Sequence, residues 1–242
     1  MSEISVVLPA YNEEKRIGNS LQKIVHYFSA VGRFDQFEII VVDDGSTDNT
    51  KEIIKSYRHS EIILLENGLN RGKGFSVKKG ILHAKYPLIL FTDSDLSTPI
   101  HELDNLVRFI DKGYDIVIGS RNLSDGSNTV ERSLSRTLMS RGFNVFVSSL
   151  ACRGFRDTQC GFKLFRSSAI KEVVQYQQLH RFSFDVEILF IAKKCGYNIK
   201  EVPVLWCEEK GSKVNPINDG VRMVFDLFKI RCMNITGKYT RT

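Results

Sequence analysis

The sequence predicts a doubly wound α/β domain, in which helices cover both faces of a mostly parallel sheet. Five short apolar segments in the first half of the chain are rich in Ile, Val and Leu without clean alternation. Such segments are typical of strands that are buried on both faces. Segments of helical character separate them, and the 242 residues are enough for one domain with a substantial core.

The first half of the chain provides five expected strands, over residues 4–9, 37–44, 61–66, 87–93 and 114–121. A helix is expected over 12–31, because apolar residues recur there at helical spacing. A second helix is expected over 48–57, and Ser46 and Thr47 before it are residue types that cap helix starts.

The second half of the chain has a looser pattern. Residues 122–131 are polar and are expected to form a loop. Helices are expected over 132–150 and 183–194, and strands over 160–166 and 199–206. We expect one α/β domain over residues 1–209, followed by a basic amphipathic C-terminal tail over 210–242.

Composition excludes several classes of protein. With 42% hydrophobic and 26% charged residues the chain is neither disordered nor fibrous, and no apolar run approaches the roughly 18 residues of a membrane span. The first residues lack the pattern of a signal peptide, so we expect a cytoplasmic protein. Five cysteines without a C-x-x-C pair argue against a disulfide framework or a zinc site. The net charge of +6 suits an anionic partner or an ordinary basic surface.

Polar residues follow three of the expected strands, at the edge where open parallel sheets bind ligands. Two carboxylates one residue apart repel each other, and a divalent cation with oxygen ligands relieves this repulsion. Magnesium and manganese commonly share such sites with the phosphates of a substrate. The residues are Pro9, Tyr11 and Glu13 after the first strand, Asp43 and Asp44 after the second, and Asp93 and Asp95 after the fourth.

Each acidic pair also has a structural interpretation. Asp93 and Asp95 are good helix caps, although a D-x-D directly after an apolar strand favours metal and phosphate binding. Asp43 and Asp44 stand in "DDGSTDNT", which contains turn chemistry and a helix-cap pattern; we assign one of them to the base or ribose of a nucleotide.

Two common nucleotide motifs are missing. "GLNRGKG" does not fit a Walker A loop, because its glycine spacing is too short and Gly74 follows Lys73 where Ser or Thr is required. No G-x-G-x-x-G follows the first strand, so a dinucleotide-dependent dehydrogenase is disfavoured.

The segments "VVLPAYNEE", "VVDDGSTDNT", "NRGKG" and "TDSDLSTP" resemble glycosyltransferase family 2. That resemblance implies a GT-A fold, related to the Rossmann fold, in which the D-x-D holds a metal on the donor diphosphate. The later segments "RDTQCGFKLF", "RFSFDVEIL", "EVPVLW" and "GSKVN" are similar to those of dolichyl-phosphate β-glucosyltransferases, which move glucose from UDP-glucose to a polyprenyl phosphate. The expected reaction is therefore an inverting, metal-dependent transfer of a hexose to a lipid phosphate.

The resemblance also implies roles for individual residues. Asp93 and Asp95 would serve Mg²⁺ or Mn²⁺ and the diphosphate, with Asp95 counted among the catalytic residues. Asp157 would be a catalytic carboxylate near the acceptor nucleophile. The residues implied for the nucleotide sugar are Pro9, Tyr11, Glu13, Asp43, Asp44, Lys73 and Asp93.

The acceptor phosphate requires cations that do not titrate, and arginine is the natural choice. Arg121 ends the fifth expected strand, and Arg136 and Ser140 follow at helical spacing. In the related polyprenyl-phosphate mannosyltransferases the matching residues clamp phosphates, so these three are assigned to the acceptor phosphate. The alternative is an ordinary basic helix face.

The tail contains apolar residues at helical spacing, and from residue 210 onward Lys and Arg outnumber Asp and Glu by seven to two. This pattern favours a helix in the headgroup layer of a membrane, or equally one packed on the protein's own core or a second subunit. We expect peripheral association with the cytosolic membrane face and no nucleic-acid partner. The apolar residues are Val221, Val224, Phe225 and Phe228.

Three other functions are consistent with parts of this pattern. A mannose or another hexose from a GDP- or UDP-sugar could be moved to the same lipid. A non-catalytic nucleotide-sugar-binding subunit has no need of the complete D-x-D, Asp157 and arginine set. A nucleotidyltransferase would need a Gly-rich basic loop after the first strand, which the sequence lacks.

Overall fold

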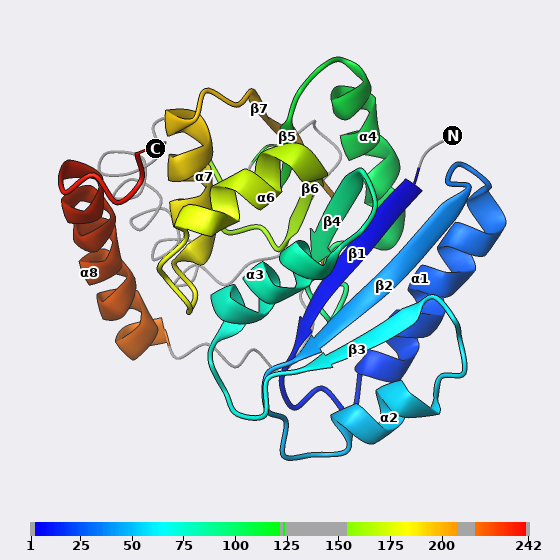
Figure 1. Cartoon of the computed structure of the whole chain (residues 1–242). Helices are drawn as coiled ribbons and strands as arrows, with labels where there is room; N and C mark the ends of the chain where they lie inside the picture. The colour runs from blue at the N-terminus through cyan, green and yellow to red at the C-terminus, as the bar shows by residue number, and fades with distance from the viewer. Residues whose placement is uncertain (1–2, 122, 124–153, 208–215, 241–242) are drawn as a thin grey trace.

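A computed structural model describes residues 3–121, 123, 154–207 and 216–240 of the chain (Figure 1). Seven strands form one sheet in the order β3-β2-β1-β4-β6-β5-β7. The strands are β1 (Glu3–Ala10), β2 (Gln36–Asp43), β3 (Ile62–Glu66), β4 (Leu88–Thr92), β5 (Ile116–Ser120), β6 (Phe162–Arg166) and β7 (Ile199–Pro203).

Helices cover both faces of this sheet, as the apolar strands require. The cluster on one face includes residues of α3, α6, α7 and α8, and the cluster on the other includes residues of α1, α2 and α4 (Figure 1). The helices are α1 (Ile17–Val31), α2 (Thr50–Ser56), α3 (Lys73–His83), the short 3₁₀ helix η1 (Ile100–Glu102), α4 (Leu103–Asp111), α6 (Ser167–Tyr176), α7 (Phe184–Lys194) and α8 (Pro216–Ile235).

The strand β6 is the exception to the parallel arrangement. It lies between β4 and β5 and runs antiparallel to both, pairing Thr92 with Phe162 and Ile118 with Lys163. Its first residues therefore lie at the edge where β1, β2, β4 and β5 end. This insertion brings the segment before β6 beside the end of β4.

The α/β class, the seven strands and the helices expected over 12–31, 48–57 and 183–194 are confirmed. The expected capping of α2 by Ser46 and Thr47 is wrong. The loops after β1 and β2 lie side by side, so Ser46 Oγ accepts a hydrogen bond from the Asn12 N–H (2.9 Å) and the Thr47 N–H donates to Asn12 Oδ1 (2.8 Å). The helix expected over 132–150 lies outside the described residues.

Candidate active site

Asp93 and Asp95 lie directly after β4, at the edge where the parallel strands end. Asp93 Oδ1 is 2.6 Å from Lys73 Nζ, and the two side chains are 34% and 26% exposed. Asp95 is half-buried, and its Oδ1 accepts a hydrogen bond from the Ser97 N–H (3.0 Å). The next helical turn, η1, follows Pro99 and has no side-chain cap. The helix-cap interpretation of the D-x-D is therefore not what the structure adopts.

Gly161 allows β6 to approach the Asp93 side chain closely. The Asp93 N–H donates to the Gly161 carbonyl oxygen (3.1 Å). A Cβ atom on Gly161 would lie 2.0 Å from Asp93 Oδ2, which is far inside van der Waals contact. The motifs "TDSDLSTP" and "DTQCGFKLF", distant in the sequence, are thus parts of one site.

Lys73 reaches Asp93 because the loop before α3 is packed tightly against the start of α7. A Cβ on Gly72 would lie 2.4 Å from the His180 carbonyl oxygen, and one on Gly74 would lie 2.6 Å from Phe184 Cβ. The glycines of "NRGKG" therefore serve close backbone packing, and the first residue of α3 carries its ammonium group to the acidic edge. This explains the motif without a Walker A loop.

The residues predicted after β1 line the neighbouring loop. Pro9 is buried at the end of β1, and Tyr11 is 37% exposed. Glu13 is buried; its carboxylate lies 2.7 Å from a terminal nitrogen of Arg16, and its N–H donates to Thr50 Oγ1 (2.7 Å). In the described contacts Glu13 thus ties the start of α1 to α2, while Tyr11 presents an accessible ring at the edge.

Asp43 and Asp44 are almost completely buried. Asp43 accepts hydrogen bonds from the N–H groups of Gly45 and Ser46, as expected for an Asp-Gly turn. Asp44 binds the following loop: Oδ1 accepts from the Arg71 N–H (2.9 Å), and Oδ2 accepts from the N–H of Gly72 (2.8 Å). Both side chains thus have a structural role: Asp43 stabilises its own turn, and Asp44 holds the loop that carries Lys73.

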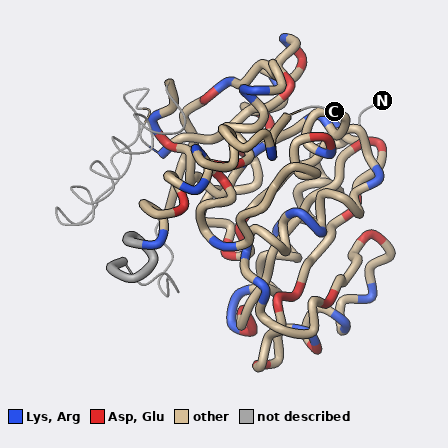
Figure 2. Tube along the Cα trace, turned by 60° about the vertical axis from the view of Figure 1, so that its left-hand side comes forward, with Lys and Arg blue, Asp and Glu red and all other residues tan. Residues whose placement is uncertain are grey.

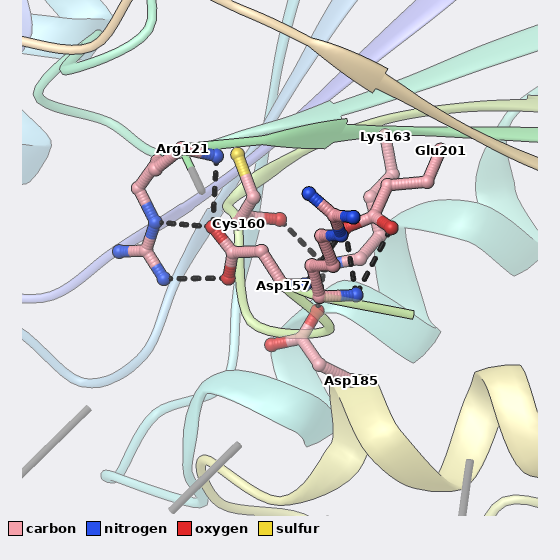
Figure 3. Close-up of polar contacts among 7 residues, drawn as sticks. Arg121, Asp157, Cys160, Lys163, Asp185 and Glu201 are labelled. Carbon is pink, nitrogen blue, oxygen red and sulfur yellow. Dashed lines mark hydrogen bonds and ion pairs between the residues drawn. The ribbon is translucent and has the colours of Figure 1, made fainter. Parts of the chain in front are cut away.

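Arg121 and Asp157 form a bidentate ion pair (Figure 3). Arg121 Nε donates to Asp157 Oδ2 (2.7 Å), a terminal guanidinium nitrogen donates to Oδ1 (2.8 Å), and the Arg121 N–H also donates to Oδ2 (2.9 Å). Burial opposes ionisation of Asp157, but the adjacent Arg121 outweighs it and lowers the pKa of Asp157 below its ordinary value. The carboxylate is therefore charged and occupied at neutral pH, which suits holding Arg121 better than accepting a proton.

Arg121 also faces the segment after β7. Its guanidinium carbon lies 5.7 Å from the centre of the Trp206 ring, within the range of a cation–π contact. The Arg121 side chain is 28% exposed, whereas that of Asp157 is 1% exposed. The pair thus presents a positive group at the edge of the sheet and keeps its negative partner inside.

Three charged residues at this site were not predicted (Figure 3). Glu201 of β7 accepts hydrogen bonds from the N–H groups of Arg156 (3.0 Å) and Asp157 (2.7 Å). Lys163 Nζ lies 2.5 Å from Asp185 Oδ1, and both side chains are buried. The available signal was a Lys inside the apolar strand "GFKLF" and an Asp inside the apolar helix "FDVEIL", since an unpaired charge is rarely buried.

These pairs form a row of alternating charges beneath the edge of the sheet. Lys163 bonds Asp185, and its positive charge also lowers the pKa of Asp157. Lys73 contacts Asp93, and the negative charge of Asp185 raises the pKa of Lys73. The row runs Arg121, Asp157, Lys163, Asp185, Lys73 and Asp93, with Asp95 as a further negative charge beside its end.

The D-x-D fits a hard divalent cation. Asp93 and Asp95 provide carboxylate oxygens at a partly exposed edge, the donor type that Mg²⁺ and Mn²⁺ prefer. No group of three or more Asp, Glu, His or Cys suited to a metal is found among residues that the structure describes. Two carboxylates are also the number that magnesium commonly takes from a protein when it binds substrate phosphates.

The C-terminal helix α8 has two apolar faces. Met223, Leu227, Ile230 and Met233 are buried, and the last three belong to the cluster that also contains residues of α7. Phe225 and Phe228, which were predicted to lie on one apolar face with Val221 and Val224, are exposed, because the helix packs on the core through the opposite side. In the parts covered by the structure, no helix has both the length and the apolar character of a membrane span.

Two predicted acceptor residues, Arg136 and Ser140, lie outside the described residues. Of the predicted set, the structure brings together Lys73, Asp93 and Asp95 at the end of β4 and places the Arg121–Asp157 pair after β5. The charge row links these two groups.

Comparison with known proteins identifies relatives of this arrangement. Residues 5–174 match the family model described as glycosyl transferase family 2. The chain is 37% identical to the dolichyl-phosphate β-glucosyltransferase of Dictyostelium discoideum, covering 97% of this chain and 75% of that protein. It is 34% identical to the human protein of the same name, covering 98% and 77%.

Solved structures share the fold. Glucosyl-3-phosphoglycerate synthase of Mycobacterium tuberculosis, in complex with Mn²⁺ and UDP-glucose, superposes with a TM-score of 0.68 at 19% identity, covering 96% of this chain and 79% of that one. Mannosyl-3-phosphoglycerate synthase of Rubrobacter xylanophilus gives a TM-score of 0.67 at 20% identity, covering 99% and 76%. At this level of identity the likeness is one of the GT-A fold.

Proposed function

This chain belongs to glycosyltransferase family 2, and we propose that it transfers glucose from UDP-glucose to a polyprenyl phosphate of the dolichyl type, with inversion at the anomeric carbon. The observation that carries the proposal is the shared edge of the sheet: an acidic pair suited to a metal, and an ion pair in which a partly exposed arginine is held by a buried aspartate, lie at that edge with the Lys163–Asp185 pair acting electrostatically on both. The names of the similar proteins support the choice of sugar and lipid.

The donor half of the reaction falls to the residues after β1, β2 and β4. Asp93 and Asp95 would hold Mg²⁺ or Mn²⁺, which when bound supplies positive charge for the departing diphosphate. Lys73 adds a second positive group beside it. Pro9, Tyr11 and Glu13 line the nucleotide, and Asp43 and Asp44 shape the loops around it while remaining our candidates for base or ribose contacts.

The acceptor half falls to Arg121, together with Arg136 and Ser140. A phosphomonoester has a second pKa of about 6, so its oxygen is already anionic near neutral pH and needs no strong base. Arg121 neutralises the acceptor phosphate while an oxygen of that phosphate attacks the anomeric carbon opposite the leaving group. Asp157 orients Arg121 and keeps its charge next to the nucleophile.

The exposed side of α8 would face the membrane that holds the lipid. Phe225, Phe228 and Ile235 are 70%, 52% and 82% exposed and fall at i, i+3 and i+10, which places them on one side of the helix. Residues 222–240 hold four Lys or Arg and one Asp, as Figure 2 illustrates. Gln159, two residues from Asp157, contacts the Met223 sulfur (3.8 Å), so this helix passes beside the acceptor side of the site.

Vesicle sedimentation tests the membrane proposal. We expect wild type to bind phosphatidylserine-containing vesicles at low salt, and the double variant Phe225→Ser/Phe228→Ser to bind at least about tenfold more weakly. Leu82→Ser, which removes an exposed apolar side chain from α3, is the matched control and should bind normally. No sedimentation of wild type would overturn the proposal, as would a dimer in light scattering that the double variant abolishes.

The reaction is tested by transfer of radiolabelled sugar into the organic phase. Purified protein is incubated with a short polyprenyl phosphate and a panel of UDP- and GDP-sugars, with and without EDTA. We expect labelling from UDP-glucose alone, and none after EDTA. Labelling from GDP-mannose would replace the sugar in this proposal, and nucleotide-sugar binding without lipid labelling would indicate a binding subunit or another acceptor.

A further inference from the structure

Lys73 and a divalent cation compete for the same carboxylate. Lys73 Nζ lies 2.6 Å from Asp93 Oδ1, so a metal that takes Asp93 as a ligand has to share that group with an ammonium ion. Burial disfavours the charged form of Lys73, but Asp93, Asp185 and Asp95 outweigh it and raise the pKa of Lys73 above its ordinary value. A lysine ammonium group is charged at neutral pH, so a cation at Asp93 would approach a positive group.

The packing around Lys73 holds its ammonium group near the end of β4. Its helix α3 is fixed by the close packing of Gly72 and Gly74 against residues 179–184. The nearby buried carboxylate, Asp185, is already paired with Lys163 (2.5 Å). A doubly charged ion at Asp93 and Asp95 is consequently repelled by an ammonium group that stays close, and repulsion of this kind is strong at partly buried sites.

A diphosphate changes this balance. It brings negative oxygens to the end of β4, where they can bind the metal and Lys73 together. Resting on the proposed function, we propose that Lys73 makes metal binding depend on the nucleotide: it weakens binding of the cation alone, and it strengthens binding of cation and diphosphate together by moving from Asp93 to the phosphates. Coupling of this kind is reciprocal, so the metal also raises the affinity for the nucleotide.

Manganese titration followed by electron paramagnetic resonance measures this coupling without turnover. Free Mn²⁺ is counted in the presence of wild-type protein, Lys73→Met and Lys73→Arg, each alone, with UDP and with uridine. Lys55→Met is the matched control, because Lys55 is an exposed lysine on α2 that pairs with Glu66 (2.8 Å). Thermal unfolding of each variant checks that the fold is retained.

We expect Lys73→Met to change the affinity for Mn²⁺ in opposite directions without nucleotide and with UDP. Without nucleotide, Lys73→Met binds Mn²⁺ at least about fivefold more tightly than wild type, because the competing charge is gone. With UDP it binds Mn²⁺ more weakly than wild type, so the ratio of the two affinities falls by at least about tenfold. Lys73→Arg and Lys55→Met behave as wild type, and uridine, which lacks phosphates, leaves every affinity unchanged.

Two outcomes would overturn the inference, and they can be told apart. If Lys73→Met binds Mn²⁺ no more tightly than wild type without nucleotide, while UDP still promotes Mn²⁺ binding in wild type, only the role of Lys73 fails. If UDP promotes no Mn²⁺ binding in wild type, the metal-dependent function itself fails and the inference with it.

Discussion

Two acidic pairs stand at the same edge of the sheet, and their surroundings differ. Asp43 and Asp44 at the end of β2 are buried, and their oxygens accept hydrogen bonds from backbone N–H groups of neighbouring loops. Asp93 and Asp95 after β4 are partly exposed; Lys73 Nζ lies 2.6 Å from Asp93, and Asp95 accepts a hydrogen bond from the Ser97 N–H. The first pair stabilises the loops of the site, and the second is the pair that we propose for the metal.

The difference arises from the segments that lie beside the end of each strand. After β2, the turn Asp43–Ser46 and the loop before α3 supply donors at short range. After β4, the antiparallel β6 brings Gly161, which has no side chain, against Asp93. Asp43 and Asp44 therefore have several backbone donors at short range, whereas the described backbone donates one hydrogen bond, from Ser97, to the side chains of Asp93 and Asp95.

The largest effect we expect is a loss of sugar transfer, which should distinguish the pair Asp93 and Asp95 from the pair Asp43 and Asp44. Asp95→Ala should lower the rate of sugar transfer by about three orders of magnitude, because the cation that neutralises the leaving diphosphate loses a ligand. The free energy of unfolding should change by less than about 1 kcal/mol, since the hydrogen bond lost among the described residues is the one from the Ser97 N–H. Radiolabel transfer and urea denaturation measure the two quantities.

The control for Asp95→Ala is Asp111→Ala, which removes an exposed carboxylate that pairs with Arg33 (3.1 Å) at the end of α4, before β5 begins. Its transfer rate should be that of wild type. Near-normal turnover by Asp95→Ala would falsify the assignment of the metal to this pair.

The second expected effect is on the free energy of unfolding, which should fall when Asp44 of the buried pair is replaced. Asp44→Ala leaves the N–H groups of Arg71 and Gly72 and the amide of Asn67 without their carboxylate acceptor. We expect the free energy of unfolding to fall by about 2–3 kcal/mol, because these donors are partly or fully buried. Urea denaturation measures this loss, and an effect no larger than that of Asp111→Ala would show that Asp44 is not structural.

The weakest effect extends the comparison to a third buried carboxylate. Glu187 accepts hydrogen bonds from Tyr239 (2.6 Å) and from the N–H groups of Gln178 and Leu179. Burial raises the pKa of Glu187, and these donors oppose that rise. Tyr239→Phe removes one of these donors and should therefore lower the free energy of unfolding by about 1.5 kcal/mol at pH 7.

The sign of the pH dependence is set by the raised pKa. A carboxyl whose pKa is higher in the folded state favours folding at low pH, and this contribution is lost as pH rises through the folded-state pKa. The charged form most needs the Tyr239 donor, so the difference between Tyr239→Phe and wild type should narrow as pH is lowered toward about 4.5. Tyr86→Phe, which removes an exposed hydrogen bond to Gln36, should show no such narrowing; a constant difference for Tyr239→Phe would contradict the role of Glu187.

Local pattern was sufficient for most of the fold. Apolar strands without alternation, separated by helical segments, predict a sheet covered on both faces, and the structure has that arrangement. The position of Asp93 and Asp95 at a strand end is also predictable from the sequence, because an apolar run ends directly before them.

The amino-acid sequence alone was enough to predict the α/β class, the order of the strands along the chain and the residue types at the edge of the site. Tertiary contacts set which carboxylates are occupied, because the antiparallel β6 and the loop before α3 bring Gly161, Lys73 and Lys163 to partners far away in the chain. They also set which face of α8 is buried, since that helix has two apolar faces and only contact with the core distinguishes them. Periodicity reports spacing along one element, whereas pairing between elements depends on topology.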